Sequence, residues 1–513
     1  MAAKLIRGGY VITDPERLPS GGLIEHGAVA VEGDSVVAVG TYDELKGRFP
    51  GAEEIGSERH VVIPGLINTH HHGWGLTPFQ LGSLDDYLES WIMDVWALPV
   101  VDAYLDCLWS DMLNIRSGVT TVLHASYGRN WGGYEVEARA KLRAHADSGI
   151  RVSFALHTLD QNMFVYEDND RFLDRLPAEL SGRVRDVLTE LAPAGTEDFF
   201  SLLGALHGEY AGHDRIKIMA CPVAPQWVSD PLLRRIRDVT NDYGMGLHLH
   251  CLESPYQREF GRTSYGKSTV EHLEGLGLLG PDVSLGHAVW LTERDMDICA
   301  QAGTSVCHNA SSNLRLRVGI MAAARMLEKG VNVSIGMDGT TLNDNEDMLQ
   351  EMRLVHKLGA LPRGLEYMAC PTSFDVLRMA TVNGARSTTF GPSIGSLAPG
   401  KKADIVLIDG DPMRAPYLDA AVHVVDAVLH RARGIDVDTV LVNGEVVLRD
   451  KVFTKLDQPT VLAELCTSAD QPPAPVTQRW QQATRDLRPH IVKFYERWET
   501  PAYDPCYTVN SLS

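Results

Sequence analysis

The stretch VIPGLINTHHH, residues 62–72, joins a short apolar run to three consecutive histidines. The apolar run Ile63–Asn68 predicts a buried strand. Residues two apart on a strand point to the same face, so His70 and His72 can bind one ion while His71 points away. Imidazole nitrogens suit a borderline cation such as Zn²⁺. The stretch therefore predicts a strand that ends at a metal site, although a lone His-x-His also arises by chance in a chain with 19 histidines.

Similar apolar runs recur along the chain. Between residues 62 and 395 they alternate with helical patterns, which favours βα units and a parallel sheet. Eight such runs predict an α/β fold, a (β/α)₈ TIM barrel, with insertions at Phe79–Ala97 and Gln161–Phe200. The predicted strands are Ile63–Asn68, Thr120–His124, Arg151–His157, Ile216–Val223, Gly246–His250, Val283–His287, Ser305–His308 and Val331–Gly336.

Two β-rich patches flank this barrel sequence. Residues 4–60 contain apolar runs joined by a tight-turn signal, and residues 403–447 contain a strand and a hairpin with Asn-Gly at its turn. Neither patch is large enough for a stable core alone. We expect them to combine, which divides the chain into three parts. These are a composite β-sandwich (1–61 plus 396–455), a metal-binding barrel (62–395) and a C-terminal helical extension (456–513).

The composition is that of an ordinary globular protein, with 513 residues of which 44% are hydrophobic and 22% charged. The 47 basic and 67 acidic side chains give a net charge of −20, which disfavours nucleic acid and anionic membranes as partners. No segment approaches the ~18 apolar residues of a membrane span, and the N-terminus lacks the apolar core of a secretory signal. The 8 scattered cysteines predict reduced thiols in a cytoplasmic protein. Any metal site must then come from histidines and carboxylates.

Polar side chains follow most of the predicted strands at their carboxyl ends, where barrel enzymes place their active sites. His250 adds a third imidazole and Asp338 a carboxylate to the histidine pair described above. Together they offer four ligands and leave an open position for water. A bound ion lowers the pKa of that water toward roughly 7. We assign Asp338 to the catalytic set as well as to the ligands.

Further strand ends carry groups that can move protons. Glu253, three residues after His250, is placed to carry a proton from the water to a leaving group. His287, at the end of the next predicted strand, can stabilise charge on the attacked atom or hold the water. His124 and His157 also end predicted strands. We interpret these two as core or supporting histidines, because the ligand set is complete without them.

In their order along the chain, these residues resemble the amidohydrolase superfamily, in its metal-dependent deaminase and chlorohydrolase branch. The similarity covers about residues 4–450. It is carried by Val62–His72, Ser117–Val122, His308–Leu316, Gly336–Gly339, Asn383–Arg386 and Gly395–Val406. The chain departs from the family pattern at Met337, where a small hydroxyl residue is usual, and at Ala310, where a proline is usual. Both positions touch the expected pocket wall, and neither removes a ligand.

The resemblance implies a distorted barrel with a small β-sandwich built from both chain ends. It also implies the roles given above: His70, His72, His250 and Asp338 as metal ligands, Glu253 as the proton shuttle and His287 as a catalytic histidine. Family members with two ions carry a carboxylated lysine at the end of the fourth strand, whereas Lys217 sits at the start of that strand here. The resemblance therefore implies one divalent ion, with Zn²⁺ favoured and Fe²⁺ as the alternative.

The expected pocket wall mixes aromatic rings with amides, which suits a flat, nitrogen-rich ring. The predicted substrate-binding residues are Trp74, Gln80, Gln161, Trp227, His308 and Asn313. No cluster of basic side chains indicates a phosphate substrate, although Arg315 and Arg317 can bind one carboxylate.

Three hypotheses follow for the function. The first is hydrolytic deamination of an aminated N-heterocycle such as a purine, pterin, pyrimidine or triazine. The second uses the same site on an amide, an aryl urea or a chlorinated ring. The third is a catalytically silent binding or scaffold protein, which the intact ligand set disfavours. We expect a small-molecule substrate and assembly as a homo-oligomer, a dimer or higher.

Overall fold

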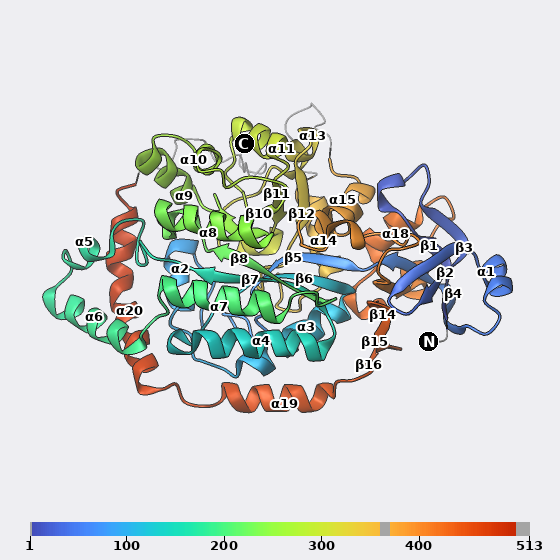
Figure 1. Cartoon of the computed structure of the whole chain (residues 1–513), viewed down its shortest axis with the longest axis horizontal. Coiled ribbons are helices and arrows are strands. Elements are labelled where there is room, and N and C mark those ends of the chain that lie inside the picture. The colour runs from blue at the N-terminus through green and yellow to red at the C-terminus, as the bar shows by residue number, and fades with distance from the viewer. Residues whose placement is uncertain (1–2, 360–369, 499–513) are drawn as a thin grey trace.

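Two eight-stranded sheets organise the chain (Figure 1). This computed structural model describes residues 3–359 and 370–498. One sheet is parallel and forms the barrel, and the other is built from both ends of the sequence. In Figure 1 the N-terminal strands in blue and the C-terminal strands in orange to red lie together beside the barrel.

The barrel sheet consists of eight strands that pair in sequence order, all of them parallel. They are β5 (Leu66–His71), β6 (Val119–Ala125), β7 (Arg151–Thr158), β8 (Ile216–Pro222), β9 (Leu247–Cys251), β10 (Val283–His287), β11 (Ser305–His308) and β12 (Asn332–Ile335). The barrel closes where β12 meets β5. There the Thr69 hydroxyl donates to the Ile335 carbonyl at 2.9 Å, and the Asp338 N–H donates to the His70 carbonyl at 2.8 Å. The predicted (β/α)₈ barrel is confirmed.

The predicted first strand, Ile63–Asn68, spans two strands of different sheets. It covers the end of β4 (Glu53–Pro64) and the start of β5, and the chain changes sheet at Gly65. A Cβ atom on Gly65 would lie 2.0 Å from Thr120 Oγ1, so only glycine allows this close approach. The sequence hides the break because both strands are buried and therefore read as one apolar run.

The second sheet runs in the order β16-β15-β14-β13-β4-β1-β2-β3. The four C-terminal strands form one half, the four N-terminal strands form the other, and no barrel strand lies between them. Besides β4, its strands are β1 (Lys4–Ile12), β2 (Leu23–Glu32), β3 (Ser35–Thr41), β13 (Ile405–Asp409), β14 (Val437–Val442), β15 (Glu445–Arg449) and β16 (Val452–Phe453). The predicted hairpin is confirmed, because Asn443 and Gly444 both have positive φ between β14 and β15. The expected small module from both chain ends is therefore present.

Helices surround the barrel and carry its crossovers. The longer ones are α3 (Ala103–Arg116), α4 (Tyr134–Ser148), α7 (Thr196–Glu209), α8 (Asp230–Tyr243), α11 (Glu293–Ala302) and α14 (Met348–Gly359). Shorter ones are α1 (Tyr42–Arg48), α9 (Pro255–Phe260), α10 (Thr269–Gly275), α12 (Ala310–Arg315), α13 (Ala323–Glu328), α15 (Ser373–Met379), α16 (Val382–Arg386), α17 (Gly410–Arg414) and α18 (Val424–Arg431). The predicted insertions contain α2 (Leu88–Val95), α5 (Asn169–Leu173) and α6 (Ala178–Leu191). Among the described residues, no helix combines the length and apolar character needed to cross a bilayer.

The C-terminal extension forms two helices, α19 (Gln458–Ala469) and α20 (Pro475–Tyr495). The long helix α20 lies against α2 and α6, the helices of the two insertions (Figure 1). Its buried face repeats every three to four residues, as an amphipathic helix requires, and consists of Thr477, Trp480, Ala483, Thr484, Leu487, Ile491 and Tyr495. This face joins an apolar cluster over the barrel that also contains Trp74 and Trp227.

From this arrangement we propose the division of the chain expected from the sequence: 1–61 with 396–455, 62–395, and 456–513. Residues 499–513 of the extension lie outside the described part of the chain.

Candidate functional site

The carboxyl ends of the barrel strands bring four sequence-predicted groups together. His70 and His72 leave β5, His250 lies on β9, and Asp338 follows β12. Asp338 Oδ1 lies 3.0 Å from the Nε2 atom of His70 and 3.0 Å from that of His72. The ring of His250 lies 4.7 Å from the ring of His70 and 5.4 Å from that of His72. All four side chains converge on one buried point.

Backbone carbonyls orient two of these imidazoles. His72 Nδ1 lies 2.8 Å from the Ala125 carbonyl, and His250 Nδ1 lies 2.8 Å from the Val223 carbonyl. Because a carbonyl only accepts, both Nδ1 atoms carry the proton, and both Nε2 lone pairs face the site. A metal-binding histidine usually donates its other ring N–H to an acceptor of this kind.

His70 is held from behind by His248, a residue without an assigned role in the sequence prediction. His70 Nδ1 lies 2.7 Å from His248 Nε2, and both rings are fully buried. The sequence signal was present, because His248 and His250 are also two apart on one strand. His70 Nε2 is buried and makes no hydrogen bond within residues 3–359 and 370–498.

The donor set fits a divalent cation. One ligand atom from each of His70, His250, His287 and Asp338 lies within 4.8 Å of the other three. Burial lowers the pKa of His250 to about 3 and that of His70 well below its usual value, so both are neutral ligands at pH 7. This geometric group contains His287 where the sequence prediction has His72. The unpartnered Nε2 of His70 beside a carboxylate and neutral imidazoles is what a nitrogen- and oxygen-liganded ion requires.

Asp338 is fixed by its own backbone and by a hydroxyl. It has φ of 61°, in the left-handed region, and Oδ2 accepts a hydrogen bond from Ser312. Burial by itself would raise its pKa, but the imidazoles of His70 and His72 hold that pKa well below the ordinary range. Leu252, His287 and Ala288 also have positive φ at strand ends. Such strained backbone clusters at functional sites, which is consistent with this rim being one.

Glu253 and His287 lie beside the four groups. Glu253 is 3% exposed, and its Oε1 atom lies 3.5 Å from His287 Nδ1. His287 Nδ1 also lies 2.9 Å from the amide oxygen of Asn313, and its Nε2 lies 3.9 Å from Asp338 Oδ2. Burial, with Asp338 and Glu89 nearby, raises the pKa of Glu253 well above its usual value. A carboxyl whose pKa is raised in this way suits general acid–base chemistry.

Glu89 is a second buried carboxyl near Glu253, and the sequence prediction missed it. It lies on α2 in the first insertion and is 3% exposed. Burial raises its pKa to about 7, and its donors are the hydroxyls of Tyr166 and Ser254. No motif marks this glutamate in the sequence, because it lies in a helix whose place over the barrel is set by tertiary packing.

Three of the six predicted substrate residues lie close to the ligands. The Trp74 ring lies 4.7 Å from that of His72, and its Nε1 is buried without a hydrogen-bond partner among the described residues. His308, at the end of β11, and Asn313 are both buried, and each likewise has an unpartnered side-chain nitrogen. Burial lowers the pKa of His308 to about 4, with His287 adding to the effect.

The other three predicted residues lie farther out. Trp227 is buried, with its ring 6.0 Å from that of Trp96. Gln161 donates to the Gln226 carbonyl at 3.3 Å and lines a cavity of about 310 Å³. Gln80 is exposed, and its side-chain oxygen accepts from the Thr77 N–H at 2.9 Å, within its own turn.

That cavity lies on the β6–β7 side of the site. It is lined by aromatic and polar side chains, including Trp96, Tyr127, Trp131, Tyr134 and His157. The Tyr127 ring lies 6.1 Å from the rings of His72 and Trp74. The cavity therefore lies next to the ligand cluster, separated from it by Tyr127.

His124 belongs to a hydrogen-bonded chain away from the ligands. Its Nδ1 lies 2.8 Å from His145 Nε2, and His145 Nδ1 lies 2.9 Å from Asp111. Arg315 is paired with Asp85 and Asp344, and Arg317 with Asp86. Both arginines that the sequence suggests for binding a substrate carboxylate therefore already form ion pairs within the protein.

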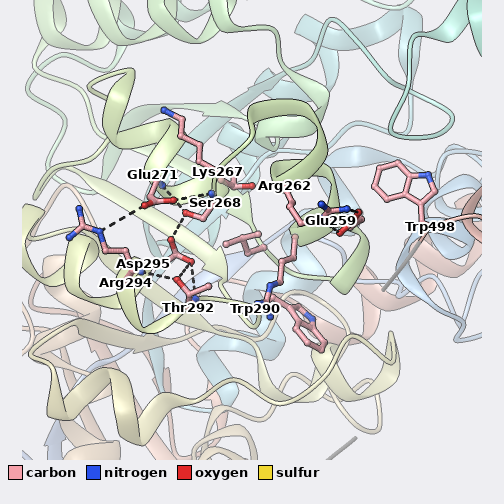
Figure 2. Close-up of a pocket in the computed structure, with 13 residues that line it drawn as sticks. Glu259, Arg262, Lys267, Ser268, Glu271, Trp290, Thr292, Arg294, Asp295 and Trp498 are labelled. Atoms are coloured by element: carbon pink, nitrogen blue, oxygen red, sulfur yellow. Dashed lines mark hydrogen bonds and ion pairs between the residues drawn. The ribbon is translucent and has the colours of Figure 1, made fainter. Parts of the chain in front are cut away.

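A larger cavity of about 800 Å³ lies beside α10 and α11 and contains none of the predicted site residues (Figure 2). Its polar groups bond to one another, as Ser268 does with Asp295, and Asp295 with Thr292 at 2.8 Å. Arg262 pairs with Glu259 on the same wall. Size alone therefore does not single out a candidate site, whereas the convergence of the predicted ligand side chains at the barrel rim does.

The sequence profile of the amidohydrolase family matches residues 61–447. A profile described as an imidazolonepropionase-like composite domain of bacteria matches residues 27–52.

Two curated relatives extend over most of the chain. The 5'-deoxyadenosine deaminase of Methanosarcina mazei is 31% identical over 479 residues, which cover 92% of this chain and 98% of that protein. The 5-methylthioadenosine/S-adenosylhomocysteine deaminase of Caldanaerobacter subterraneus subsp. tengcongensis is 30% identical over 444 residues, covering 85% and 92%.

Solved structures share the fold. A zinc-bound adenosine deaminase from Xanthomonas campestris matches with a TM-score of 0.76 and 24% identity, covering 94% of this chain and 98% of that one. A mutant atrazine chlorohydrolase from Arthrobacter aurescens, complexed with zinc and atraton, matches with a TM-score of 0.78 and 21% identity, covering 91% and 99%.

Proposed function

Because the chain belongs to the amidohydrolase family, we propose that its strand-end site hydrolyses the exocyclic C–N bond of an aminated nitrogen heterocycle and releases ammonia. One observation carries the proposal. His70 of β5, His72 directly after it, His250 of β9 and Asp338 after β12 meet around a single point, with Glu253 and His287 beside them.

We assign the metal-ligand role to His70, His72, His250 and Asp338. His72 is preferred to His287 because its Nε2 lies 3.0 Å from Asp338 Oδ1, whereas His287 Nε2 lies 3.9 Å from the other oxygen. A divalent ion in such a set supplies Lewis acidity that lowers the pKa of a water molecule from 15.7 toward about 7. We propose one ion, zinc, with Fe²⁺ as the alternative; the zinc in a solved structure of the same fold supports this choice.

The chain's own residues then move the protons. Glu253 takes a proton from the attacking water as the water oxygen bonds to the amine-bearing carbon. It delivers that proton to the ring nitrogen, so negative charge does not accumulate on the ring. Glu253 then takes the remaining proton from the new C–OH group and passes it to the amine. The C–N bond breaks, ammonia leaves, and the oxygen stays on the carbon as a carbonyl. His287, whose Nδ1 proton is held by Asn313, presents the Nε2 lone pair to the site, where it can accept a hydrogen bond from the attacking water and hold it.

The substrate class follows from the walls. Trp74 and Tyr127 offer flat apolar faces beside His72, with Trp227 farther out, and His308 and Asn313 offer polar atoms without partners in the described chain. Such a wall holds a planar ring and orients it. The deamination of adenine nucleosides by the two curated relatives makes aminopurine nucleosides the first substrates to test.

An activity screen tests the proposal. The zinc-loaded protein is assayed for ammonia release from aminopurines and their nucleosides, pterins, aminopyrimidines and aminotriazines. Amides, aryl ureas and chlorinated triazines are assayed in parallel for their own products, and Glu253→Gln serves as the inactive control. Ammonia release from the aminated rings supports the proposal. Turnover of the second group alone replaces it with the other hydrolytic reaction, and a protein that binds no transition ion and turns over nothing is a scaffold.

The proposal also covers the location of the protein, its assembly and its partner. A cytoplasmic location is supported by the five buried free thiols, at Cys107, Cys221, Cys251, Cys299 and Cys307; Cys506 lies outside the described residues. A homo-oligomeric assembly is proposed alongside it and is tested by light scattering of the purified protein. The partner in catalysis is a small molecule, with no role for nucleic acid.

A further inference from the structure

We propose that the C-terminal helix α20 and the buried Glu89 position the proton-shuttle residue Glu253, through the hydrogen-bonded chain Tyr495–Tyr166–Glu89–Ser254. The inference rests on the role proposed for Glu253. It gives the C-terminal extension and a buried carboxyl a function that the reaction scheme does not otherwise contain.

The first link joins Glu89 to the residue after Glu253. Ser254 donates its hydroxyl proton to Glu89 Oε1, and the same Ser254 oxygen accepts the Gln257 N–H and caps α9. Gln257 in turn accepts the Glu253 N–H at 2.8 Å through its side-chain oxygen. Glu89 therefore holds the turn that determines where the Glu253 carboxyl points.

The second link joins Glu89 to the second insertion and to α20. Tyr166 donates its hydroxyl proton to Glu89 Oε1 at 2.9 Å, and the Tyr166 backbone N–H donates to the Tyr495 hydroxyl at 3.2 Å. The Tyr495 ring also packs on Tyr256 of α9, with centroids 4.8 Å apart. Tyr495 is 2% exposed, so it reaches the chain from inside the apolar cluster over the barrel.

Helix α20 is anchored independently of this chain. Trp480 Nε1 donates to the Trp96 carbonyl at 2.9 Å, and Gln481 donates to the Ala97 carbonyl at 3.0 Å. Arg488 pairs with Asp94 at 3.0 Å. These contacts fix α20 to the first insertion, and the ion pair Arg183–Asp486 at 2.8 Å fixes it to the second.

The chemistry of Glu89 argues against a passive packing role. Burying a carboxyl costs folding free energy unless hydrogen bonds compensate for the lost water. An apolar side chain would fill the same space without that cost. Its two donors are neutral hydroxyls, and both lie on paths to the Glu253 turn. What the arrangement requires of residue 89 is an acceptor oxygen at that place.

The test compares Glu89→Leu with Glu89→Gln. Leucine removes the acceptor, whereas glutamine keeps a carbonyl oxygen for both hydroxyls. We expect Glu89→Leu to lower kcat roughly 10–100-fold, the usual cost of losing a supporting hydrogen bond around an active-site group. The KM of Glu89→Leu is expected to stay within about twofold of that of the natural protein, with the same metal content. Glu89→Gln is expected to keep kcat within about threefold of the natural value. Equal loss in both variants, or a loss of thermal stability without a change in kcat, overturns the proposal.

Tyr495→Phe tests the contribution of α20, with Tyr256→Phe as the matched control. Tyr256 packs on the same ring but donates no hydrogen bond to the chain among the described residues. We expect Tyr495→Phe alone to lower kcat about two- to fivefold, and to add nothing in the Glu89→Leu background, because residues that act through one chain are not additive. Additive effects, or an equal effect of Tyr256→Phe, contradict the chain.

A readout without substrate keeps this inference separate from the proposed function. Backbone hydrogen exchange over residues 253–258 is expected to speed up in Glu89→Leu and to stay unchanged in Glu89→Gln. If Glu253→Gln stays active, the shuttle role proposed for Glu253 fails whatever Glu89 does. If Glu253→Gln is inactive while Glu89→Leu changes neither exchange nor kcat, the positioning chain alone fails.

Discussion

The amide oxygen of Asn313 lies 2.9 Å from His287 Nδ1. Since an amide oxygen accepts, this contact places the His287 proton on Nδ1 and leaves the Nε2 lone pair toward the ligand cluster. Asn313 thereby sets both the tautomer and the ring orientation of His287.

Asn313→Leu is expected to lower kcat about 10–100-fold, in the range found when a supporting partner of an active-site histidine is removed. Asn313→Asp keeps an acceptor at the same place and is expected to retain more activity than the leucine variant. Steady-state kinetics on the best substrate, with metal content measured for each variant, check the ranking. Equal activity in all three proteins would mean that the contact does not orient His287.

Glu253→Gln is expected to keep its metal and lose at least roughly 10² in turnover, because the amide cannot carry the proton. Metal analysis and single-turnover ammonia release are the measurements. Glu259→Gln is the control; Glu259 is a buried glutamate of α9 that pairs with Arg262, away from the ligands. Near-full activity of Glu253→Gln refutes the shuttle role.

His250→Ala is expected to weaken metal binding by at least about 10²-fold, since even indirect supports of such ligands cost 10–100-fold. Equilibrium dialysis against a zinc buffer measures it. The control is His207→Ala, because the His207 ring stacks on Tyr243 of α8. This variant is expected to keep its full affinity for zinc. Unchanged zinc affinity in His250→Ala contradicts the ligand assignment.

The barrel, and the convergence of the four predicted ligand side chains at its rim, could be predicted from the sequence because both follow from local patterns. The strands β10 and β11 have the predicted bounds, since short apolar runs that end at a histidine are sharply delimited. The change of sheet at Gly65 could not be predicted, because buried strands on both sides read alike.

The supporting residues could not be predicted, because their roles come from contacts between distant segments. Glu89 and Tyr166 meet across 77 residues of sequence, and nothing in either segment marks the pair. The sequence predicts Gln80 in the pocket wall; in the structure it is exposed and its side-chain oxygen accepts the Thr77 N–H within its own turn.

A pH-dependent contribution to stability is expected from Glu351, which accepts the Ser311 N–H at 2.9 Å. Burial raises the pKa of Glu351 to about 7. A carboxyl whose pKa is raised in the folded state stabilises the fold at low pH. That contribution falls as the pH rises from the unfolded-state pKa through about 7 and is constant above it. Glu351→Gln does not titrate, so the unfolding midpoint of the natural protein should fall relative to that of the variant between pH 5 and 8. A constant difference across this range contradicts the assignment.

The two sheets are joined by a buried ion pair. Arg151, at the start of β7, donates to both oxygens of Asp404 at 3.0 Å, and the Asn443 N–H donates to the same carboxylate at 2.7 Å. Removing one partner leaves an uncompensated buried charge, so Asp404→Ala is expected to cost about 3–5 kcal/mol of stability. The control is Glu209→Ala, which breaks an exposed pair with Arg139 and should cost ~1 kcal/mol or less. Urea unfolding of the three proteins measures both. A similar small loss in the two variants would show that the pair does not hold the terminal sheet against the barrel.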